Sequence, residues 1–191
     1  MKYIIASDIH GSALYCGRLL ERCKAEGACG LLLLGDLLYH GPRNDLPEGY
    51  APKEVIAMLN PLKEQILCVR GNCEAEVDQM VLDFDVSTKH RALELFGSKL
   101  FMTHGHHINI DAPAPELSGG AEYVLYGHTH IPLKAEKDGV WYLNPGSVTI
   151  PKNGSDHAYI LLDESGFVWK TLDGTEYDRL EFGVKNHTNI I

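Results

Sequence analysis

The sequence predicts an α/β fold in which two β-sheets pack face to face, with helices on the outside. The first observation behind this is a strand–helix alternation in the N-terminal half, where short apolar runs are each soon followed by Gly or Asp. The second is a series of strand pairs joined by short turns in the C-terminal half. The chain of 191 residues has no linker rich in Pro, Gly or Ser, so we expect one domain over residues 1–191.

The N-terminal apolar runs predict strands at residues 3–6, 31–34 and 66–69. The helix between the first two strands is expected to begin after Ser12, whose hydroxyl can accept a backbone N–H, and to run to about Glu26. Gly27 is its expected stop. A second helix is predicted at residues 53–59. Residues 39–52, rich in Gly, Pro and Asn, are predicted to form a long loop, and long loops in compact domains are often functional.

The C-terminal half is predicted to consist mainly of strands, at residues 92–96, 100–103, 123–126, 133–137, 140–143, 158–162 and 167–172. Gly97-Ser98 is expected to turn the first pair. Asp138-Gly139 is a strong two-residue hairpin signal between the fourth and fifth of these strands. Because the two halves differ in this way, we expect each half to supply one of the two sheets.

Composition limits the classes of function. The formal net charge of −9 argues against broad nucleic-acid binding through a basic surface. No apolar stretch approaches the roughly 20 residues that cross a bilayer, and the N-terminus lacks the longer apolar region of a secretory signal. The five cysteines are odd in number and lack paired short spacings, which is typical of a reducing compartment. We therefore expect a cytoplasmic protein without membrane contact.

Side chains of metal-ligand type follow five predicted strands: Asp8, His10, Asp36, Asn72, His104, His128 and His130. The carboxyl ends of strands are where ligand sites assemble in open α/β sheets, so we expect these side chains at one edge. Seven oxygen and imidazole donors are too many for one tetrahedral ion but suit two ions that share a carboxylate, for which Asp36 is the best candidate. Taken singly, such residues are more often caps, turn residues or structural histidines, so the prediction depends on the ordered set.

Two ligand pairs have the spacing Asp8-x-His10 and His128-x-His130. Residues two apart on an extended or turning backbone project to the same side, so each pair is expected to clasp a metal. The set contains no thiolate, and manganese, iron, zinc and nickel are all chemically compatible with it. No nucleophile elbow of the Ser or Cys type is present, which agrees with metal-based chemistry.

The ordered motifs resemble the calcineurin-like metallophosphoesterase superfamily over nearly the whole chain. They are Ser7-Asp8-Ile9-His10-Gly11, Leu34-Gly35-Asp36, Arg70-Gly71-Asn72-Cys73-Glu74, Thr103-His104-Gly105-His106 and Gly127-His128-Thr129-His130. Residues 40–44, 46–50, 76–80 and 144–147 are similar to the YfcE-type phosphodiesterases of bacteria within that superfamily. The resemblance implies a four-layer α/β/β/α sandwich of two packed mixed sheets flanked by helices.

The resemblance also implies a division of the ligands between two divalent ions. Asp8, His10, Asp36 and His130 would hold one ion, and Asp36, Asn72, His104 and His128 the other. We expect manganese first, with zinc, iron or nickel as alternatives. Two such ions, about 3.5–4 Å apart, activate a bridging hydroxide for attack on phosphorus, which implies a dinuclear-metal-dependent phosphodiesterase acting on small phosphodiesters.

The residues expected to take part in catalysis are Asn72, Cys73 and His106. Much of the superfamily has His after the metal-binding Asn, but this chain has Cys73, and YfcE-type members share that cysteine. A thiol is a weaker hydrogen-bond donor than an imidazolium, so we predict a preference for diesters with good leaving groups such as aryl phosphates. His106 is the candidate substitute acid. The alternatives are that Cys73 is simply a small buried residue and that His106 supports a neighbouring ligand.

Loop residues around the site have less specific roles. His40 is predicted to be a surface or loop residue that, beside the long loop, could approach substrate, and Arg43 and Asn44 either contact a phosphate or leaving group or merely fix their loop. The remaining histidines are predicted to lie on the surface or in loops: His90, His107, His157 and His187. The turn at residues 144–147 is expected to brace the metal-ligand loops from behind.

Two other functions remain open at this stage. The fold also resembles that of the retromer subunit Vps29, so a non-catalytic protein-binding scaffold is one alternative, although a scaffold does not need seven ordered ligands. A phosphomonoesterase or a small nuclease is the other. The exposed long loop and the C-terminal strands leave homo-oligomer formation open.

Overall fold

The computed structural model describes residues 1–183, which form two mixed β-sheets and three α-helices. The strands of the first sheet are β1 (Tyr3–Ala6), β2 (Gly30–Leu33), β3 (Ile66–Cys68), β9 (Ala158–Asp163), β10 (Gly166–Thr171) and β11 (Glu176–Glu181). Their order in space is β11-β10-β9-β1-β2-β3. The strands of the second sheet are β4 (His90–Leu95), β5 (Ser98–Thr103), β6 (Tyr123–Leu125), β7 (Pro132–Lys137) and β8 (Val140–Pro145). Their order is β4-β5-β6-β8-β7.

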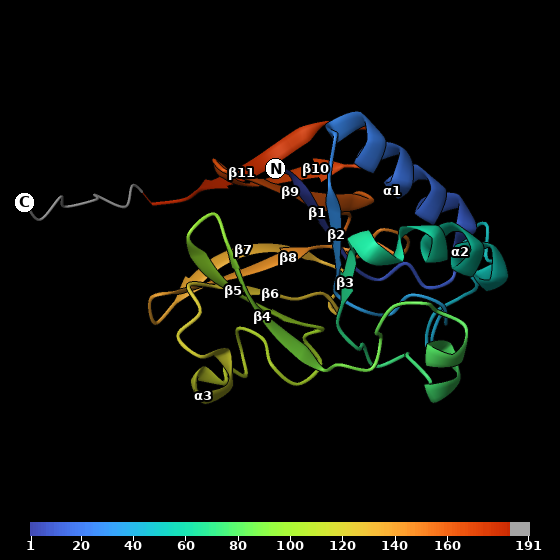
Figure 1. Cartoon of the computed structure of the whole chain (residues 1–191), viewed down its shortest axis with the longest axis horizontal. Coiled ribbons are helices and arrows are strands. Elements are labelled where there is room, and N and C mark those ends of the chain that lie inside the picture. The colour runs from blue at the N-terminus through green and yellow to red at the C-terminus, as the bar shows by residue number, and fades with distance from the viewer. Residues whose placement is uncertain (184–191) are drawn as a thin grey trace, which may run out of the picture.

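The helices form the outer layers of the molecule. They are α1 (Ala13–Glu26), α2 (Pro52–Leu59) and α3 (Pro115–Ser118), with 3₁₀ turns η1 (Asn60–Gln65) and η2 (Glu76–Met80). Figure 1 shows α1 and α2 together against the first sheet and α3 on the opposite side, below the second sheet. The four-layer α/β/β/α prediction is confirmed, with an outer layer over the second sheet that is thin.

Alternating side chains of the central strands explain the layering. In β1, Ile4 belongs to the core shared with α1 and α2, whereas its neighbour Ile5 belongs to the core between the two sheets. In β5, Leu100 belongs to that same inner core, whereas its neighbour Phe101 belongs to a third buried cluster on the other face of the second sheet. Successive residues of a strand point to opposite faces, so a strand that is apolar throughout is buried on both sides.

The first helix follows the prediction closely. Its Ser12 hydroxyl accepts a hydrogen bond from the Tyr15 N–H at 3.3 Å, which satisfies one of the unpaired donors at a helix start. Gly27 ends the helix in the left-handed conformation, with φ of 67°. Ser12 also donates to the Glu48 carbonyl at 2.6 Å, so the helix start fixes the long loop that the sequence predicted.

The assignment of one sheet to each half of the chain is wrong. Strands β9, β10 and β11 return to the first sheet, where β9 pairs antiparallel with β1 in the register Ile4↔Leu161. Hydrophobic periodicity reveals strands but not their distant partners, which explains the error. Strand β11 was not predicted, because four of its six residues are charged and it lies at the edge of the sheet, where little apolar surface is buried.

The first predicted hairpin turn is shifted by one residue. Leu95 pairs with Ser98, so the turn consists of Phe96 and Gly97, with φ of 53° and 71°. A two-residue turn of this kind needs positive φ at both positions, which Gly97 adopts freely and Phe96 does not. The Asp138-Gly139 hairpin, by contrast, forms as predicted, with φ of 53° and 77°.

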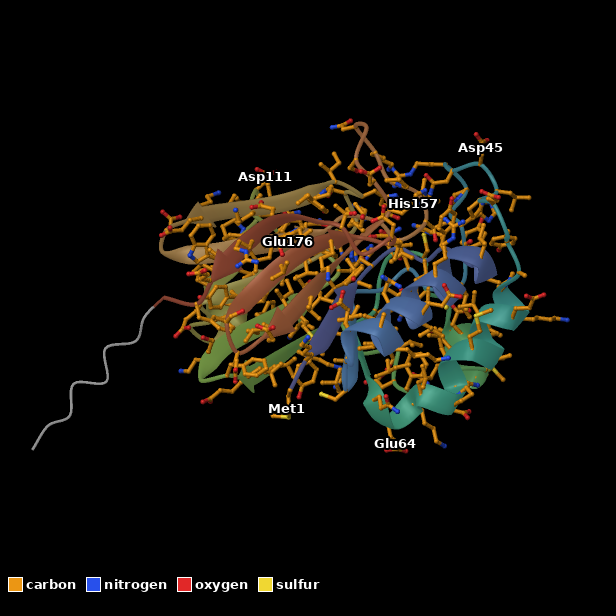
Figure 2. All side chains as sticks on the ribbon, turned by 90° about the horizontal axis from the view of Figure 1, so that it is seen from above. Met1, Asp45, Glu64, Asp111, His157 and Glu176 are labelled. Carbon is orange, nitrogen blue, oxygen red and sulfur yellow. The ribbon has the colours of Figure 1, made fainter. Side chains whose placement is uncertain are left out.

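The long loop between β2 and α2 extends beside the edge where strand ends meet. Asp45 lies at its outer tip (Figure 2). Within residues 1–183, no helix has both the length and the apolar character needed to cross a membrane.

Candidate metal centre

The backbone at most of the predicted ligands is left-handed. The residues are Asp8 (φ 61°), His10 (48°), Asp36 (58°), His128 (65°) and His130 (61°). The other non-glycine residues of the described chain with positive φ are Phe96, Asp138 and Asn153, each directly before a glycine in a turn. Backbone in sparsely populated regions costs on the order of 1–3 kcal/mol per residue and clusters at functional sites. Sharp turns, rather than the pleat of a strand, therefore aim these side chains.

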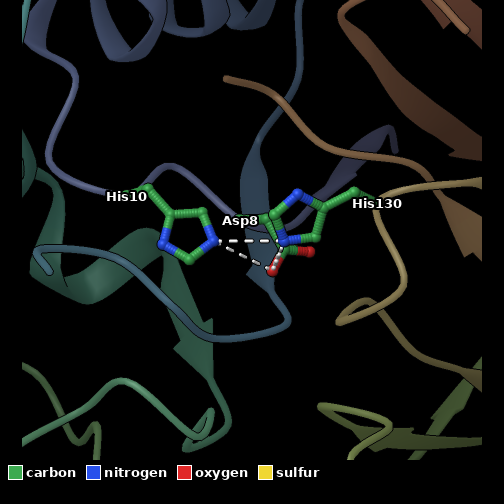
Figure 3. Close-up of side chains that lie close together, drawn as sticks. All are labelled: Asp8, His10 and His130. Atoms are coloured by element: carbon green, nitrogen blue, oxygen red, sulfur yellow. Dashed lines mark hydrogen bonds and ion pairs between the residues drawn. The ribbon is translucent and has the colours of Figure 1, made fainter. Parts of the chain in front are cut away.

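Asp8, His10 and His130, which we call the closed half of the site, form a buried group (Figure 3). The Nε2 atoms of His10 and His130 lie 3.5 and 3.3 Å from Oδ1 of Asp8 and 3.2 Å from each other. All three side chains are at most a few per cent exposed. Three donor atoms thus converge on one point that water hardly reaches.

The open half of the site consists of Asn72, His104 and His128. Nε2 of His104 lies 3.1 Å from Oδ1 of Asn72 and 3.3 Å from Oδ2 of Asp36. His104 is buried, whereas Asn72 is exposed and His128 is half-buried. The His128 ring stands 5.2 Å from that of His104, measured between centroids, and belongs to none of the groups of donor atoms that lie within 4.8 Å of one another.

Asp36 lies between the two halves. Its carboxylate is 3.8 Å from Nε2 of His10 and 3.3 Å from Nε2 of His104. The expected bridging position is therefore geometrically available to it. His130 contacts Asp8 through Nε2, and the His128 ring lies beside the His104 ring, so the binding of a metal by the pair His128-x-His130 stays a prediction.

Backbone carbonyls orient three of the imidazole rings. Nδ1 of His10, of His104 and of His130 each lies 2.7 Å from a carbonyl oxygen. The carbonyls belong to Tyr39, Leu34 and Ile150, respectively. A carbonyl can only accept, so each Nδ1 carries the hydrogen and each Nε2 faces the centre, which is the arrangement that metal-binding histidines use.

The carboxylate and imidazole donors of the closed half suit a divalent cation. Oδ1 of Asp8 is buried and has no hydrogen-bond partner, which is costly for a carboxylate oxygen. The facing Nε2 atoms of His10 and His130 present two lone pairs to each other when both rings carry hydrogen on Nδ1. A divalent cation among these atoms satisfies all three at once, and carboxylates and imidazoles together suit manganese, iron, zinc or nickel.

The facing carboxylates and imidazoles of the site shift one another's pKa values. Burial opposes ionisation of Asp8, but the facing imidazoles of His10 and His130 hold the pKa of Asp8 well below its usual value. Burial also disfavours a charge on His104, yet the facing Asp36 raises the pKa of His104 to about 9. The same pairing lowers the pKa of Asp36 despite its burial. Protons therefore occupy imidazoles of this site at neutral pH when cations do not.

Glu74 organises the site from behind, a role that was not predicted. Its buried carboxylate accepts the backbone N–H groups of Asp36 (2.9 Å), Leu37 (2.6 Å) and Gly71 (2.5 Å). It thereby ties the Asp36 turn to the loop that carries Asn72. Burial and then repulsion from Asp36 raise the pKa of Glu74 to about 7, and the N–H donors of Asp36 and Leu37 oppose that rise. Its position in the Gly71–Glu74 motif was the available signal.

The turn at residues 144–147 braces the ligand loops, as predicted. Nδ2 of Asn144 donates to the Gly127 carbonyl at 2.7 Å, directly before His128. Ser147 donates its hydroxyl to the Asp8 carbonyl at 2.9 Å. The loops of the two sheets are thus joined through this turn.

A cavity of about 460 Å³ opens over the site. Its lining includes Asp36, Cys73 and four of the other predicted ligands, His10, Asn72, His128 and His130. Arg43 and Asn44 line it too, so the loop that the sequence singled out does reach the site. Lys152 also lines it, and no motif had pointed to this residue. His40 and His106 are not among the lining residues.

The two candidate proton donors differ from an imidazolium. Cys73 donates its backbone N–H to Oδ1 of Asp36 at 2.8 Å, and burial followed by the nearby Asp36 raises the pKa of its thiol. Burial, and then repulsion from His104, lowers the pKa of His106 to about 4. At neutral pH the side chains of both residues are therefore uncharged.

The other histidines lie away from the centre. The His157 ring stacks on Tyr15 with centroids 4.0 Å apart, and its Nδ1 bonds with the Val148 carbonyl. His90 stacks on Phe101. His107 is exposed, whereas His40 is half-buried, and His187 lies outside the described residues.

Comparison with known families matches residues 1–166 to the calcineurin-like phosphoesterase superfamily domain. Phosphodiesterase YfcE of Escherichia coli (strain K12) is 45% identical over 163 residues, which covers 85% of this chain and 88% of that protein. The probable metallophosphoesterase YsnB of Bacillus subtilis is 30% identical over 170 residues, covering 85% of this chain and 83% of YsnB.

Solved structures of related proteins share the fold of this chain. The structure of the E. coli phosphoesterase YfcE superposes with a TM-score of 0.89 at 39% identity, over 96% of this chain and all of that one. Vps29 of Entamoeba histolytica superposes with a TM-score of 0.63 at 21% identity, over 96% of this chain and 100% of that one. The likeness to Vps29 at this identity concerns the fold alone.

Proposed function

The chain belongs to the calcineurin-like phosphoesterase superfamily, a family of hydrolases, and on this basis we propose that it is a metal-dependent phosphodiesterase acting on small phosphodiesters. The observation that carries the proposal is the buried convergence of two carboxylates with the Nε2 atoms of three histidines. The 45% identity to a protein named as a phosphodiesterase supports diesters as the substrate class.

We infer two divalent ions, held by Asp8, His10, Asp36 and His130 and by Asp36, Asn72, His104 and His128. Such ions, when bound, activate water for attack on phosphorus and neutralise charge on the phosphate oxygens. Manganese is the first candidate, with zinc, iron or nickel as alternatives that suit the same donors. The thiol of Cys73 also lies within 4.8 Å of donor atoms of His10 and Asp36, but burial and then Asp36 raise its pKa, which disfavours the thiolate that a metal needs.

The two candidate proton donors are expected to be weak acids, and of the two only Cys73 lines the cavity. Cys73 offers a neutral thiol beside Asn72, and His106, with its pKa lowered to about 4, offers a neutral imidazole. A thiol of raised pKa and a neutral imidazole are both very weak acids, so they can hydrogen-bond to a departing oxygen but transfer a proton to it poorly. We therefore propose that the enzyme favours diesters with acidic leaving groups such as phenols.

The decisive experiment assays metal-stripped protein after reconstitution with one ion at a time, against bis-aryl and mono-aryl phosphates side by side. We expect no turnover without metal, restoration by manganese first, and faster cleavage of the diester than of the monoester. A series of aryl and alkyl diesters should give rates that fall as the leaving-group pKa rises. Metal-independent turnover would contradict the proposal, and a faster monoester reaction would replace the diester assignment.

The non-catalytic scaffold is the less favoured alternative, because only the fold is shared with Vps29. Replacing Asp36 by Asn separates the two readings. An enzyme loses metal and turnover, whereas a scaffold keeps its affinity for a partner protein. A cytoplasmic location, homo-oligomer formation and a single domain over residues 1–191 stay predictions.

A further inference from the structure

Two cationic side chains line the cavity over the metal centre, although the chain as a whole carries a formal net charge of −9. Arg43 and Lys152 reach it from different loops. Asp36 is the only carboxylate among its described lining residues, and that carboxylate already contacts His104 and the Cys73 N–H. The wall available to a substrate outside the metal site is therefore positively charged.

The backbone at Lys152 is anchored to a predicted ligand. Its N–H donates to the His130 carbonyl at 3.2 Å, while Nδ1 of His130 donates to the Ile150 carbonyl at 2.7 Å. The Lys152 carbonyl accepts both the N–H and the hydroxyl of Ser155, at 3.1 and 2.7 Å. The ammonium group is thus carried by a closed turn whose position depends on the metal centre itself.

Arg43 stands on a second closed turn. The Asn44 N–H donates to the Gly41 carbonyl at 3.3 Å, and Nδ2 of Asn44 donates to the His40 carbonyl at 2.7 Å. Gly41 has φ of 79° and lies against Cys73, where an added Cβ would come within 3.2 Å of the thiol sulfur. The turn is thereby held at the side of the cavity that Cys73 lines.

Neither cation is neutralised by the protein. Within residues 1–183, the guanidinium of Arg43 and the Nζ of Lys152 have no hydrogen-bond or ion-pair partner, whereas Lys134 and Lys170 are paired with carboxylates. Asp45 borders the neighbouring groove together with Arg43 and forms no ion pair with it. Both side chains are exposed, so an anion that binds them must order two long side chains, a cost that charge-assisted hydrogen bonds to a phosphate can offset.

We propose that Arg43 and Lys152 bind a second phosphate group of the substrate, so that the enzyme prefers phosphodiesters that carry an additional phosphate. The inference rests on the proposed function and narrows its substrate class. A cavity of about 460 Å³ exceeds the needs of one phosphate and suits a nucleotide-sized molecule. Guanidinium and ammonium groups are the usual phosphate partners, and the metal centre accounts for the scissile phosphate only.

A matched pair of substrates tests the proposal. Thymidine 5′-(4-nitrophenyl phosphate) and its 3′-phosphorylated form release the same phenol and differ only in the added phosphate. We expect the manganese-loaded protein to have a KM roughly tenfold lower for the 3′-phosphorylated ester, with similar kcat. Lys152→Met and Arg43→Met should each raise that KM by roughly five- to tenfold, well beyond their effect on the KM of the other ester, so that the preference is reduced. High salt should reduce the preference.

Matched variants and a binding measurement complete the design. Lys152→Arg should keep the preference, and Lys63→Met, at an exposed position on η1 outside the cavity, should not change it. Calorimetry should show tighter binding of thymidine 3′,5′-bisphosphate than of thymidine 5′-monophosphate, with the difference lost in Lys152→Met. Equal KM values and equal affinities in the unmodified protein, or a preference that survives both Met substitutions, would overturn the inference. Selective binding without hydrolysis of either ester would support it and contradict the proposed function.

Discussion

The two halves of the metal centre differ in how completely the protein forms them. In the closed half, Asp8, His10 and His130 are buried, and Nε2 of each histidine lies within 3.5 Å of one carboxylate oxygen. In the open half, Asn72 is exposed and the His128 ring is half-buried. Preformed donors pay the cost of ordering during folding, whereas mobile donors pay it on binding. The closed half should therefore hold its ion more tightly.

The difference follows from what supports each half. The closed-half histidines are fixed by carbonyls at 2.7 Å, and Asp8 is also held by the His128 N–H at 3.1 Å. In the open half, only His104 has an equivalent carbonyl contact. Asn72 lines the cavity and has Nδ2 3.2 Å from the Cys73 sulfur, a weak acceptor. The cavity is lined by members of both halves, Asn72 and His128 of the open half and His10 and His130 of the closed half.

The largest effect is expected from the residue that joins the halves. Asp36→Asn removes the charge that faces both His10 and His104, so both ions should bind more weakly. Metal ions contribute several kcal/mol to transition-state stabilisation, which corresponds to a loss of about 10³-fold or more in kcat/KM. Metal content and diester turnover are measured together. Asp138→Asn, in a distant hairpin turn, is the matched control and should retain both. Full metal content in Asp36→Asn would refute the bridging role.

A pair of substitutions tests the inequality of the halves directly. His10→Ala should lower the affinity of the tighter ion by roughly 10²-fold or more, because a buried, oriented donor is lost. Asn72→Ala should lower the affinity of the weaker ion by roughly tenfold. Titration of metal-stripped protein with manganese, followed by calorimetry, resolves the two events. Equal losses would show that the exposed position of Asn72 does not weaken the open half.

Glu74→Gln should weaken both halves through the backbone. A Gln side chain has one acceptor oxygen where the carboxylate offers two, so it cannot accept all three N–H groups that converge on Glu74. We expect metal affinity to fall roughly 10- to 100-fold and the free energy of unfolding to fall by about 1–3 kcal/mol. Glu76→Gln, an exposed neighbour, is the control. Unchanged affinity in Glu74→Gln would mean that the Asp36 turn is fixed by other contacts.

Much of this centre could be predicted from the sequence, because its donors directly follow apolar strands. Asp8, Asp36 and His104 are such cases, and their convergence follows from the geometry of strand ends. Glu74 and Lys152 could not be recognised in the same way. Glu74 acts on backbone groups of distant residues, and Lys152 reaches the cavity only because its turn is bonded to His130.

The fold, like the site, could be predicted where the signal is local in the sequence. Local signals fixed the start of α1 at Ser12 and the hairpin at Asp138-Gly139. They did not reveal that β9 crosses back to pair with β1, since register between distant strands leaves no local trace. The left-handed backbone at His10 and His128 was equally hidden, because such strain is stabilised by surrounding contacts rather than by residue type.

The smallest predicted effect concerns protons exchanged for metal. Burial disfavours a charge on His104, but Asp36 raises the pKa of His104 to about 9 in the metal-free protein, so its ring is protonated at pH 7. A folded pKa above the ordinary value of 6.5 means that this pairing stabilises the metal-free fold below about pH 6.5 and that its contribution is lost as pH rises through 9. A metal ion needs the Nε2 lone pair, so loading should release at least one proton at pH 7.5 and affinity should rise about tenfold per pH unit until pH 9. Calorimetry in buffers of different ionisation enthalpy counts these protons. Proton release that is absent at pH 7.5 would place His104 outside the metal site and leave the open half with only Asn72 and His128.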